Sequence, residues 1–312
     1  MLKRLHAPWI VLVLALSGAC GGEGSREFLS LGTAGTGGVY YPLGGAIASR
    51  MSLADSTRRY TAEVSGGSVE NVNRIAAGQM DLGIVMGVTA YQAQRGGEEY
   101  ERPVPGLRVV APLYANLTHI LVPGSSRASS VADFAGMRVS VGTAGSGTEQ
   151  MSRDVLTAHG LGYEDIEPRY LSFSESAAAL RDGAIDAAII SVGYPAAAVL
   201  EATTTAGVRL LSVSEEVLAA MLADHPYYSR DRIPSGVYPG VDEPIVTVSV
   251  MNWIVAMESL DARVVSTLLN LFSTDRVSLE QVHEMARQID LDRLADAPIP
   301  LHPTTQEWRD AR

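Results

Sequence analysis

The chain has 312 residues, enough for one large domain or two of ordinary size. Hydrophobic residues make up 46% and charged residues 19%, a balance typical of a folded chain with a substantial core. The 24 basic residues are outnumbered by 35 acidic ones, which argues against nucleic acid as a partner because phosphate backbones need a basic surface. Lys3 is the only lysine, so a chain from which this segment is removed can supply neither a P-loop nor a Schiff base.

The N-terminal segment predicts an export signal. Two basic residues precede a short apolar run at 9–16, which is about half the length of a membrane span. Small residues follow, up to Cys20, the only cysteine, at the place where bacterial lipoproteins carry their lipidated residue. The same small residues also fit ordinary signal cleavage. We expect a signal peptide at 1–19, a lipid-anchored or flexible linker at 20–27, and a periplasmic or extracytoplasmic mature chain that touches membrane only through its anchor.

The remainder of the chain contains an internal repeat. A short β-rich segment at 28–31 leads into Gly32-Thr-Ala-Gly-Thr-Gly37. After a spacing of 110 residues, a similar segment at 139–141 leads into Gly142-Thr-Ala-Gly-Ser-Gly147. Each glycine loop is followed by a stretch with helical spacing.

A second pair of segments repeats at a spacing of 105 residues. Gly78–Val85 and Gly183–Ile190 each follow a helix-like stretch and open an unbroken apolar strand. Unbroken apolar strands that alternate with helices predict a buried, mostly parallel sheet. We therefore expect an α/β fold of two lobes with one plan, each with a mostly parallel sheet flanked by helices. Each lobe would offer its glycine loop at the carboxyl edge of its sheet, where open α/β sheets bind ligands.

Turn-rich segments mark two places where the chain crosses between the lobes. We expect lobe 1 to comprise residues 28–121 and 246–312, and lobe 2 to comprise residues 122–245. Two hinge strands, near Leu121–Pro123 and Pro244–Thr247, would join them and allow the lobes to close.

The glycine loops predict an anion site. A glycine loop at the start of a helix presents unpaired backbone N–H groups and the positive end of the helix dipole. Ser146 and Thr148 add hydroxyl donors in the second loop, as Thr33 and Thr36 do in the first. Tight turns alone would explain a single loop, whereas a matching pair favours ligand binding.

Tyrosine supplies 12 of the aromatic residues. Tyr40 follows the first loop, Tyr114 ends an apolar strand, and Tyr194 follows another. A tyrosine at a strand end gives a flat apolar wall with a polar tip, which suits a small polar ligand. Core or rim packing explains any single one equally well.

Catalysis and metal binding lack support in the sequence. Ser146 has no flanking glycines of a nucleophile elbow, and the first loop does not match the dinucleotide fingerprint. The histidines show no metal-ligand spacing, and only one cysteine is present. Asp81 and Asp186 stand before two equivalent strands, which favours turn or cap roles over an acid–base pair. We expect no enzymatic activity, no metal and no cofactor; a hydrolase that uses Ser146 is the enzymatic alternative.

Several segments resemble the TAXI family, the extracytoplasmic solute receptors of tripartite ATP-independent periplasmic (TRAP) transporters. The longest is Gly32–Ala48, and the resemblance extends in the family's order from about Phe28 to Trp308. The other matching segments are Ser65–Asn71, Gly142–Glu149, Gly183–Ala187, Tyr238–Gly240 and Ile299–Pro303.

The resemblance implies a two-lobed type II periplasmic-binding-protein fold that closes on a small organic anion, either a glutamate-like amino acid or a related carboxylate. It implies delivery of that ligand to a TRAP membrane permease; a sensory receptor of the same fold is the alternative. Glu70 would meet the ammonium group of an amino acid, or would serve as a capping acid. The ligand-binding residues that the resemblance implies are Thr36, Gly37, Tyr40, Ser68, Glu70, Asn71, Gly145, Ser146, Gly147, Thr148, Ser191 and Tyr194.

Two features depart from the family pattern. Asn116 stands where the family often has an acidic residue, which bears on how an amino group would be recognised. No arginine lies within a pocket motif, so a bidentate carboxylate clamp cannot be assigned.

Overall fold

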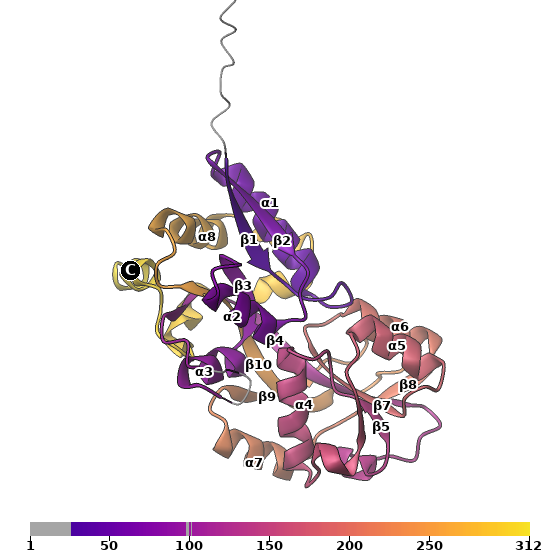
Figure 1. The fold of residues 1–312 in the computed structure, drawn as a ribbon. Helices are drawn as coiled ribbons and strands as arrows, with labels where there is room; N and C mark the ends of the chain where they lie inside the picture. Colours follow the sequence, from indigo (N-terminus) through magenta and orange to yellow (C-terminus); the bar gives the residue numbers. More distant parts are fainter. Residues whose placement is uncertain (1–25, 98–99, 101) are drawn as a thin grey trace, which may run out of the picture.

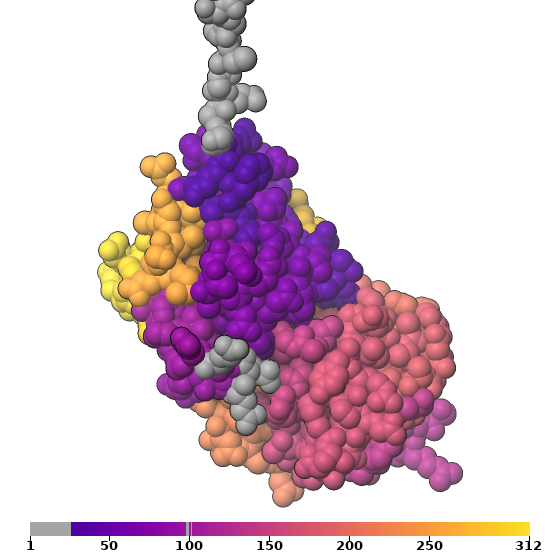
Figure 2. Space-filling model, viewed as in Figure 1, coloured from indigo at the N-terminus to yellow at the C-terminus, as the bar shows by residue number. Residues whose placement is uncertain are grey.

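The computed structural model describes residues 26–97, 100 and 102–312. The predicted signal peptide and Cys20 lie outside the described residues. Figure 1 shows two lobes: the indigo and purple elements form one together with the orange and yellow C-terminal segments, and the magenta and salmon elements form the other. Figure 2 shows these two lobes in contact along one boundary. No helix in the described part of the chain is long and apolar enough to cross a bilayer.

Lobe 1 is built around three parallel strands. β1 lies between β2 and β3, and every residue of β3 is buried. The helices that follow these strands begin at the carboxyl edge of the sheet. The elements are β1 (Glu27–Gly32), α1 (Tyr40–Ala54), β2 (Arg58–Glu63), α2 (Ser68–Ala76), β3 (Leu82–Met86) and α3 (Gly87–Arg95).

Lobe 2 has the same plan, as the repeat predicted. β5 lies between β6 and β7 in parallel, so β5, β6 and β7 correspond to β1, β2 and β3. The core elements are β5 (Arg138–Ser140), α4 (Gly147–Ala158), β6 (Glu167–Arg169), α5 (Phe173–Arg181) and β7 (Ala187–Val192). The other elements are η1 (Val131–Phe134), η2 (Tyr163–Asp165), α6 (Ala197–Thr205), β8 (Val208–Leu211), α7 (Glu215–Asp224) and β9 (Tyr228–Ile233).

The two aspartates at the repeated strand starts have equivalent structural roles. Asp81 accepts a hydrogen bond from the backbone N–H of Ser30 at 2.7 Å, which joins the start of β3 to β1. Asp186 accepts one from the backbone N–H of Arg138 at 2.9 Å, which joins the start of β7 to β5. Each carboxylate therefore holds together two neighbouring strands of its own lobe.

Two long antiparallel strands, β4 (Leu107–Pro123) and β10 (Ile245–Met257), join the lobes into one ten-stranded sheet. Within β10, residues 252–255 pair with β3 and residues 245–250 pair with β9. Within β4, residues 117–121 pair with β7. The register of β4 on β10 shifts between Met251 and Trp253, close to where the strands change partners.

The predicted hinge positions, 121–123 and 244–247, lie at the lobe 2 ends of these two strands. The turn residues that suggested these positions mark only the ends of the strands. Each strand extends from there through lobe 2 into lobe 1, and most of its residues are buried along the whole length. The predicted division of the chain into lobes stays a prediction.

The C-terminal segment returns to lobe 1. Asp261 caps α8 by accepting from the backbone N–H of Arg263 at 2.7 Å, and α8 packs against α1. The backbone N–H of His302 donates to the carbonyl of Val109 at 2.8 Å, which ties the end of the chain to β4. The elements are α8 (Ala262–Thr274), α9 (Arg276–Glu280), η3 (Glu284–Gln288), η4 (Leu291–Asp296) and α10 (Pro303–Asp310).

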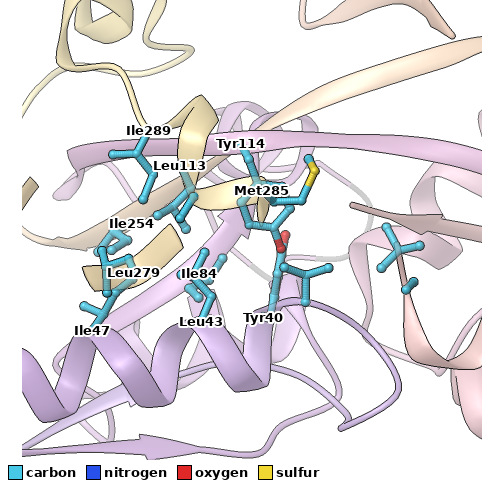
Figure 3. Packing of buried hydrophobic residues seen from close by; sticks show 14 of the residues in the cluster. Tyr40, Leu43, Ile47, Ile84, Leu113, Tyr114, Ile254, Leu279, Met285 and Ile289 are labelled. Carbon is cyan, nitrogen blue, oxygen red and sulfur yellow. The ribbon is translucent and has the colours of Figure 1, made fainter. Parts of the chain in front are cut away.

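The largest core cluster fixes the position of α1 on the sheet. Figure 3 shows Tyr40, Leu43 and Ile47 on one face of α1, directed at strand residues that include Ile84 and Ile254. All five side chains are buried. Because burial of each large apolar side chain stabilises the fold by about 1.5–3 kcal/mol, this contact holds the first turn of α1 firmly.

Candidate ligand-binding site

A cavity of about 420 Å³ lies between the two lobes. Most of its lining comes from residues at or just after the carboxyl ends of β1, β2 and β3 in lobe 1 and of β5, β6 and β7 in lobe 2, and Asn116 of β4 completes it. This is the edge at which open α/β sheets bind ligands, and the volume falls in the range typical of small-molecule sites.

The repeat gives the cavity an approximate two-fold arrangement. On one side, the α2 start in lobe 1 meets the α4 start in lobe 2: the Thr143 hydroxyl donates to the Gly66 carbonyl at 2.8 Å. On the other side, the α1 start meets α5 and α6: the backbone N–H of Ala198 donates to the Gly37 carbonyl at 3.1 Å. A Cβ atom on Gly37 would lie only 2.6 Å from Ser174 Oγ. The lobes therefore touch on both sides of the cavity.

The helix starts direct hydrogen-bond donors at this space. The first N–H groups of a helix have no partner within it. Among the described residues, those of Ser68 and Val69 in α2, and of Gly147 and Thr148 in α4, donate to no other protein group. Gly67, which precedes α2, has a φ of 124°, a conformation that favours glycine. Together with the positive ends of the helix dipoles, these donors form a site for an anion without a charged side chain.

Asn116 of β4 lines the inner wall of the cavity and belongs to a hydrogen-bond network that includes Tyr40, Ser191 and, behind the wall, Asn252 of β10. The Tyr40 hydroxyl donates to Asn252 Oδ1 at 2.5 Å, and Asn252 Nδ2 donates to Asn116 Oδ1 at 2.8 Å. Asn116 Nδ2 in turn donates to the Ser191 carbonyl at 3.2 Å. Burial raises the pKa of Tyr40 well above its usual value, against the smaller opposite effects of hydrogen bonds to Ser68 and Asn116. Tyr40 is therefore a neutral hydroxyl at physiological pH.

Ser191 offers a free hydroxyl in this wall. Its Oγ is buried and has no hydrogen-bond partner within the described part of the chain. Thr148 Oγ1 donates to the Ser191 carbonyl at 3.4 Å, so its oxygen also lies nearby. Since an unpartnered buried hydroxyl costs free energy, Ser191 Oγ is well suited to a hydrogen bond with a ligand.

Glu175 is the only ionisable acid or base among the described lining residues apart from the Tyr40 phenol, and no arginine, lysine or histidine joins it. It stands in the first turn of α5, where its carboxylate accepts from the backbone N–H of Ser172 at 2.8 Å. Hydrogen bonds from Ser172 hold the pKa of Glu175 below its usual value. The carboxylate is therefore ionised at physiological pH.

Eight of the sequence-predicted residues line the cavity. They come from the first glycine loop, the starts of α1, α2 and α4, and the end of β7. They are Thr36, Gly37, Tyr40, Ser68, Ser146, Gly147, Thr148 and Ser191.

Glu70 and Asn71 lie outside the lining because their side chains hold the chain locally. The Glu70 carboxylate accepts from the backbone N–H of Gly66 at 2.7 Å and lies 3.8 Å from the guanidinium of Arg74. The buried Asn71 amide donates to the carbonyls of Thr33, just after β1, and of Ile84, in the middle of β3, each at 2.9 Å, and so connects these two strands. Of the two roles expected for Glu70, this arrangement corresponds to the capping acid.

Gly145 and Tyr194 also lie outside the lining. Gly145 forms the turn before α4 with a φ of 74°, and its carbonyl accepts from the backbone N–H of Glu70 at 3.1 Å. Tyr194 lies beyond the lining residues Ser191 and Val192 and packs against the largest core cluster.

Several lining residues lie outside the sequence motifs, above all the segment Ser172–Glu175. The 105-residue spacing could have identified it, because this spacing relates Ser68–Glu70 at the start of α2 to Phe173–Glu175 at the start of α5. Asn116 was noted only as a departure from the family pattern, yet it lines the cavity.

Ser146 has a structural role that differs from that of a catalytic nucleophile. Its Oγ caps α4 by accepting from the backbone N–H of Glu149 at 3.1 Å. No histidine is found among the described residues that line the cavity.

The fold is that of the periplasmic binding proteins, and the predicted two-lobed fold class is confirmed. PhnD1 from Prochlorococcus marinus, solved with methylphosphonate, aligns with a TM-score of 0.58 at 13% identity over 91% of this chain and 96% of that one. A binding protein of an ABC phosphonate transporter from Pseudomonas aeruginosa gives 0.54 at 10% identity over 85% and 80%. The aliphatic sulphonate binding protein SsuA from Escherichia coli gives 0.50 at 19% identity over 92% and 84%.

The sequence also matches a family model over almost its whole described length. The model of the NMT1-like family matches residues 31–308, a range that contains both lobes and every residue of the cavity lining. The chain belongs to the NMT1-like family.

Proposed function

We propose that the protein is an extracytoplasmic solute-binding receptor that captures a small organic anion between its lobes. The observation that carries this proposal is the cavity itself, which is bounded by both lobes and has unpaired backbone N–H groups at the starts of α2 and α4. The proposal agrees with the names of the structural neighbours, which bind a sulphonate or a phosphonate.

The ligand in this proposal is a glutamate-like amino acid or a related carboxylate. Its carboxylate would accept from the N–H groups at the starts of α2 and α4 and from the hydroxyls of Ser68, Thr148 and Ser191. Tyr40 and Asn116 would contact the part of the ligand at the inner wall. Closing of the lobes about the long strands would bring these groups together on the ligand.

The proposed partner is a TRAP-type membrane permease, which would receive the ligand from the closed receptor. This part of the proposal rests only on the sequence motifs that resemble the TAXI family. The structural neighbour from Pseudomonas aeruginosa is, by contrast, a component of an ABC transporter. Uptake by membrane vesicles distinguishes the two types of transporter. Uptake through a TRAP permease is driven by an ion gradient and needs no ATP. Uptake that stops when ATP is withheld would contradict a TRAP permease as the partner.

Anchoring through a lipid on Cys20 completes the proposal. A Cys20→Ser variant is expected to leave the membrane fraction and appear in the soluble fraction. Labelling with a radioactive fatty acid provides a direct check, because a wild-type protein that incorporates no label contradicts lipidation.

Ligand capture can be tested by a thermal-shift screen of protein unfolded and refolded to remove carried-over ligand. The panel holds glutamate, glutamine, aspartate, 2-oxoglutarate, succinate and pyruvate. A ligand present at 100 times its dissociation constant stabilises the folded state by about 2.7 kcal/mol, which raises the Tm by several degrees. A panel that produces no shift would contradict a glutamate-like or related carboxylate ligand.

A further inference from the structure

The repeat places two glutamates at equivalent positions, Glu70 in lobe 1 and Glu175 in lobe 2. Each is the third residue of its helix, α2 or α5, and the two lie 105 residues apart in the sequence. Each carboxylate reaches back to a backbone N–H of the preceding loop: Glu70 to Gly66 at 2.7 Å and Glu175 to Ser172 at 2.8 Å. In each lobe, the glutamate at this position therefore holds the start of its own helix.

The surroundings of these two carboxylates differ. Glu70 lies 3.8 Å from Arg74 and outside the cavity lining. At the position equivalent to Arg74, α5 carries Ala179, and Glu175 has no ion-pair partner among the described residues. Because Glu175 also lines the cavity, the two related sides of the site differ in charge.

Hydrogen bonds from Ser172 stabilise the Glu175 carboxylate, but no cationic side chain is found among the described lining residues. The other described lining side chains are neutral at physiological pH, and the donors at the starts of α2 and α4 are backbone N–H groups. These backbone N–H groups can donate hydrogen bonds to one anionic group of a ligand. A second anionic group near α5 would meet a carboxylate instead of a cation, and the repulsion would be moderated by solvent because Glu175 is exposed.

We infer that Glu175 determines the charge class of the ligand. It selects ligands that offer one anionic group to the donors of α2 and α4 and whose end near α5 is neutral or cationic overall, as in an amino acid whose ammonium balances its second carboxylate. It discriminates against ligands that place an unbalanced anionic group near α5. The inference rests on the proposed function, because it assumes that the cavity binds an organic acid. It moves the recognition of an ammonium group from Glu70 to its repeat partner in lobe 2.

The variant Glu175→Gln tests the inference with little risk to the fold. A glutamine side chain has an amide oxygen that accepts from the backbone N–H of Ser172, and glutamine serves as well as glutamate at the third position of a capping box. The change therefore removes the charge and keeps the start of α5 in place. Glu164→Gln is the control, since it removes one negative charge from the same lobe at η2, outside the cavity lining.

Three probes of similar size vary the charge of the ligand: glutamine is neutral overall, glutamate carries one net negative charge, and 2-oxoglutarate carries two. Isothermal titration measures the Kd of each with the wild type and both variants. We expect the wild type to prefer glutamate to 2-oxoglutarate, and Glu175→Gln to reduce that preference by about three- to tenfold. Glu164→Gln should leave the preference unchanged, and raised salt should weaken the preference of the wild type.

The outcomes separate the inference from the function on which it rests. A wild type that binds one of these acids, with a preference that Glu175→Gln leaves within twofold, overturns the inference while the receptor function stands. An equal change with Glu164→Gln overturns it too, because the effect would then arise from the overall charge of the lobe. If none of the three probes binds any of the proteins, the proposed ligand class is wrong and the inference fails with it.

Discussion

Asn252 and Asn116 connect the two strands that run through both lobes, with Asn252 Nδ2 donating to Asn116 Oδ1 at 2.8 Å. Two backbone carbonyls fix the direction of the bonds around them. Asn252 Nδ2 also donates to the carbonyl of Tyr114 at 2.8 Å, and Asn116 Nδ2 donates to that of Ser191 at 3.2 Å. Since a carbonyl only accepts, both amides are oriented, and the Tyr40 hydroxyl must donate to Asn252 Oδ1.

Replacement of Asn252 by alanine should destabilise the protein by about 2–4 kcal/mol. The change leaves three buried partners without their bonds, namely the Tyr40 hydroxyl, the Tyr114 carbonyl and Asn116 Oδ1. Urea denaturation measures the loss of the free energy of unfolding. Asn270→Ala, at an exposed position of α8, is the control and should change stability by less than about 0.5 kcal/mol. Similar losses in the two variants would show that the network contributes little.

Ser191→Ala should weaken ligand binding without a loss of stability. Ser191 Oγ has no partner in the described part of the chain, so its removal breaks no hydrogen bond within the protein. We expect the Kd for the best acid of the screen to rise by about three- to tenfold, with the Tm of the free protein unchanged or slightly higher. Ser152→Ala is a matched control, because Ser152 Oγ is also buried and unpartnered but does not line the cavity. An unchanged Kd in Ser191→Ala would remove this hydroxyl from the ligand contacts.

Gly37→Ala should impair closure of the lobes. Its Cβ atom would lie 2.6 Å from Ser174 Oγ and 3.2 Å from the Cβ atom of Ala198, and both neighbours belong to the other lobe. Ligand affinity should fall by about tenfold, because the closed state is penalised while each lobe keeps its own core. Gly45→Ala, in the middle of α1, meets no atom within 4 Å and should bind as the wild type does. Small-angle scattering with saturating ligand provides the check, and full compaction of Gly37→Ala would contradict the prediction.

Acid should destabilise the protein in part through His119. Burial lowers the pKa of His119 to about 4, from an ordinary value near 6.5. Its Nδ1 lies 2.9 Å from the Leu117 carbonyl, and its Nε2 lies 3.1 Å from the Tyr238 hydroxyl, so the neutral ring has a partner on each nitrogen. Between pH 6.5 and pH 4 the unfolded chain binds a proton at this residue and the folded chain does not, so stability falls as the pH falls through this range.

The variant His119→Gln isolates this contribution, because other histidines with lowered pKa values remain in both proteins. The variant should be less stable than the wild type at pH 7.5. It should, however, lose less stability on transfer to pH 5, by about 2 kcal/mol. Urea denaturation at both pH values measures the difference. Parallel pH profiles of the two proteins would mean that His119 titrates normally.

The sequence repeat predicted much of the architecture because each repeat unit is a local pattern. Apolar strands, glycine loops and helix starts follow one another within a few dozen residues, and the loops at Gly37 and Ser146 lie at the cavity as the pattern indicates. The long strands were predicted only in part, because turn residues beside an apolar run do not show that the run is shared by two lobes.

The hydrogen-bond network behind the inner wall of the cavity could not be predicted from local patterns. Asn252 stands in an apolar strand, and its partners Tyr40 and Asn116 are 212 and 136 residues away in the sequence. The choice between Glu70 and Glu175 was also beyond a local pattern. Both occupy the same helix position, and the difference lies in the cavity lining and in Arg74, which pairs with only one of them.

The path of β10 sets the order in which the chain can complete its two halves during synthesis. Lobe 1 begins at Glu27, yet β3 receives its antiparallel neighbour only when residues 252–255 have been made. The bond from the His302 N–H to Val109 comes later still. A chain that ended after β9 would contain the three parallel strands of each lobe, but the edge of β3 that pairs with β10 would be uncovered. The strand that completes the sheet around β3 is therefore supplied only near the end of synthesis.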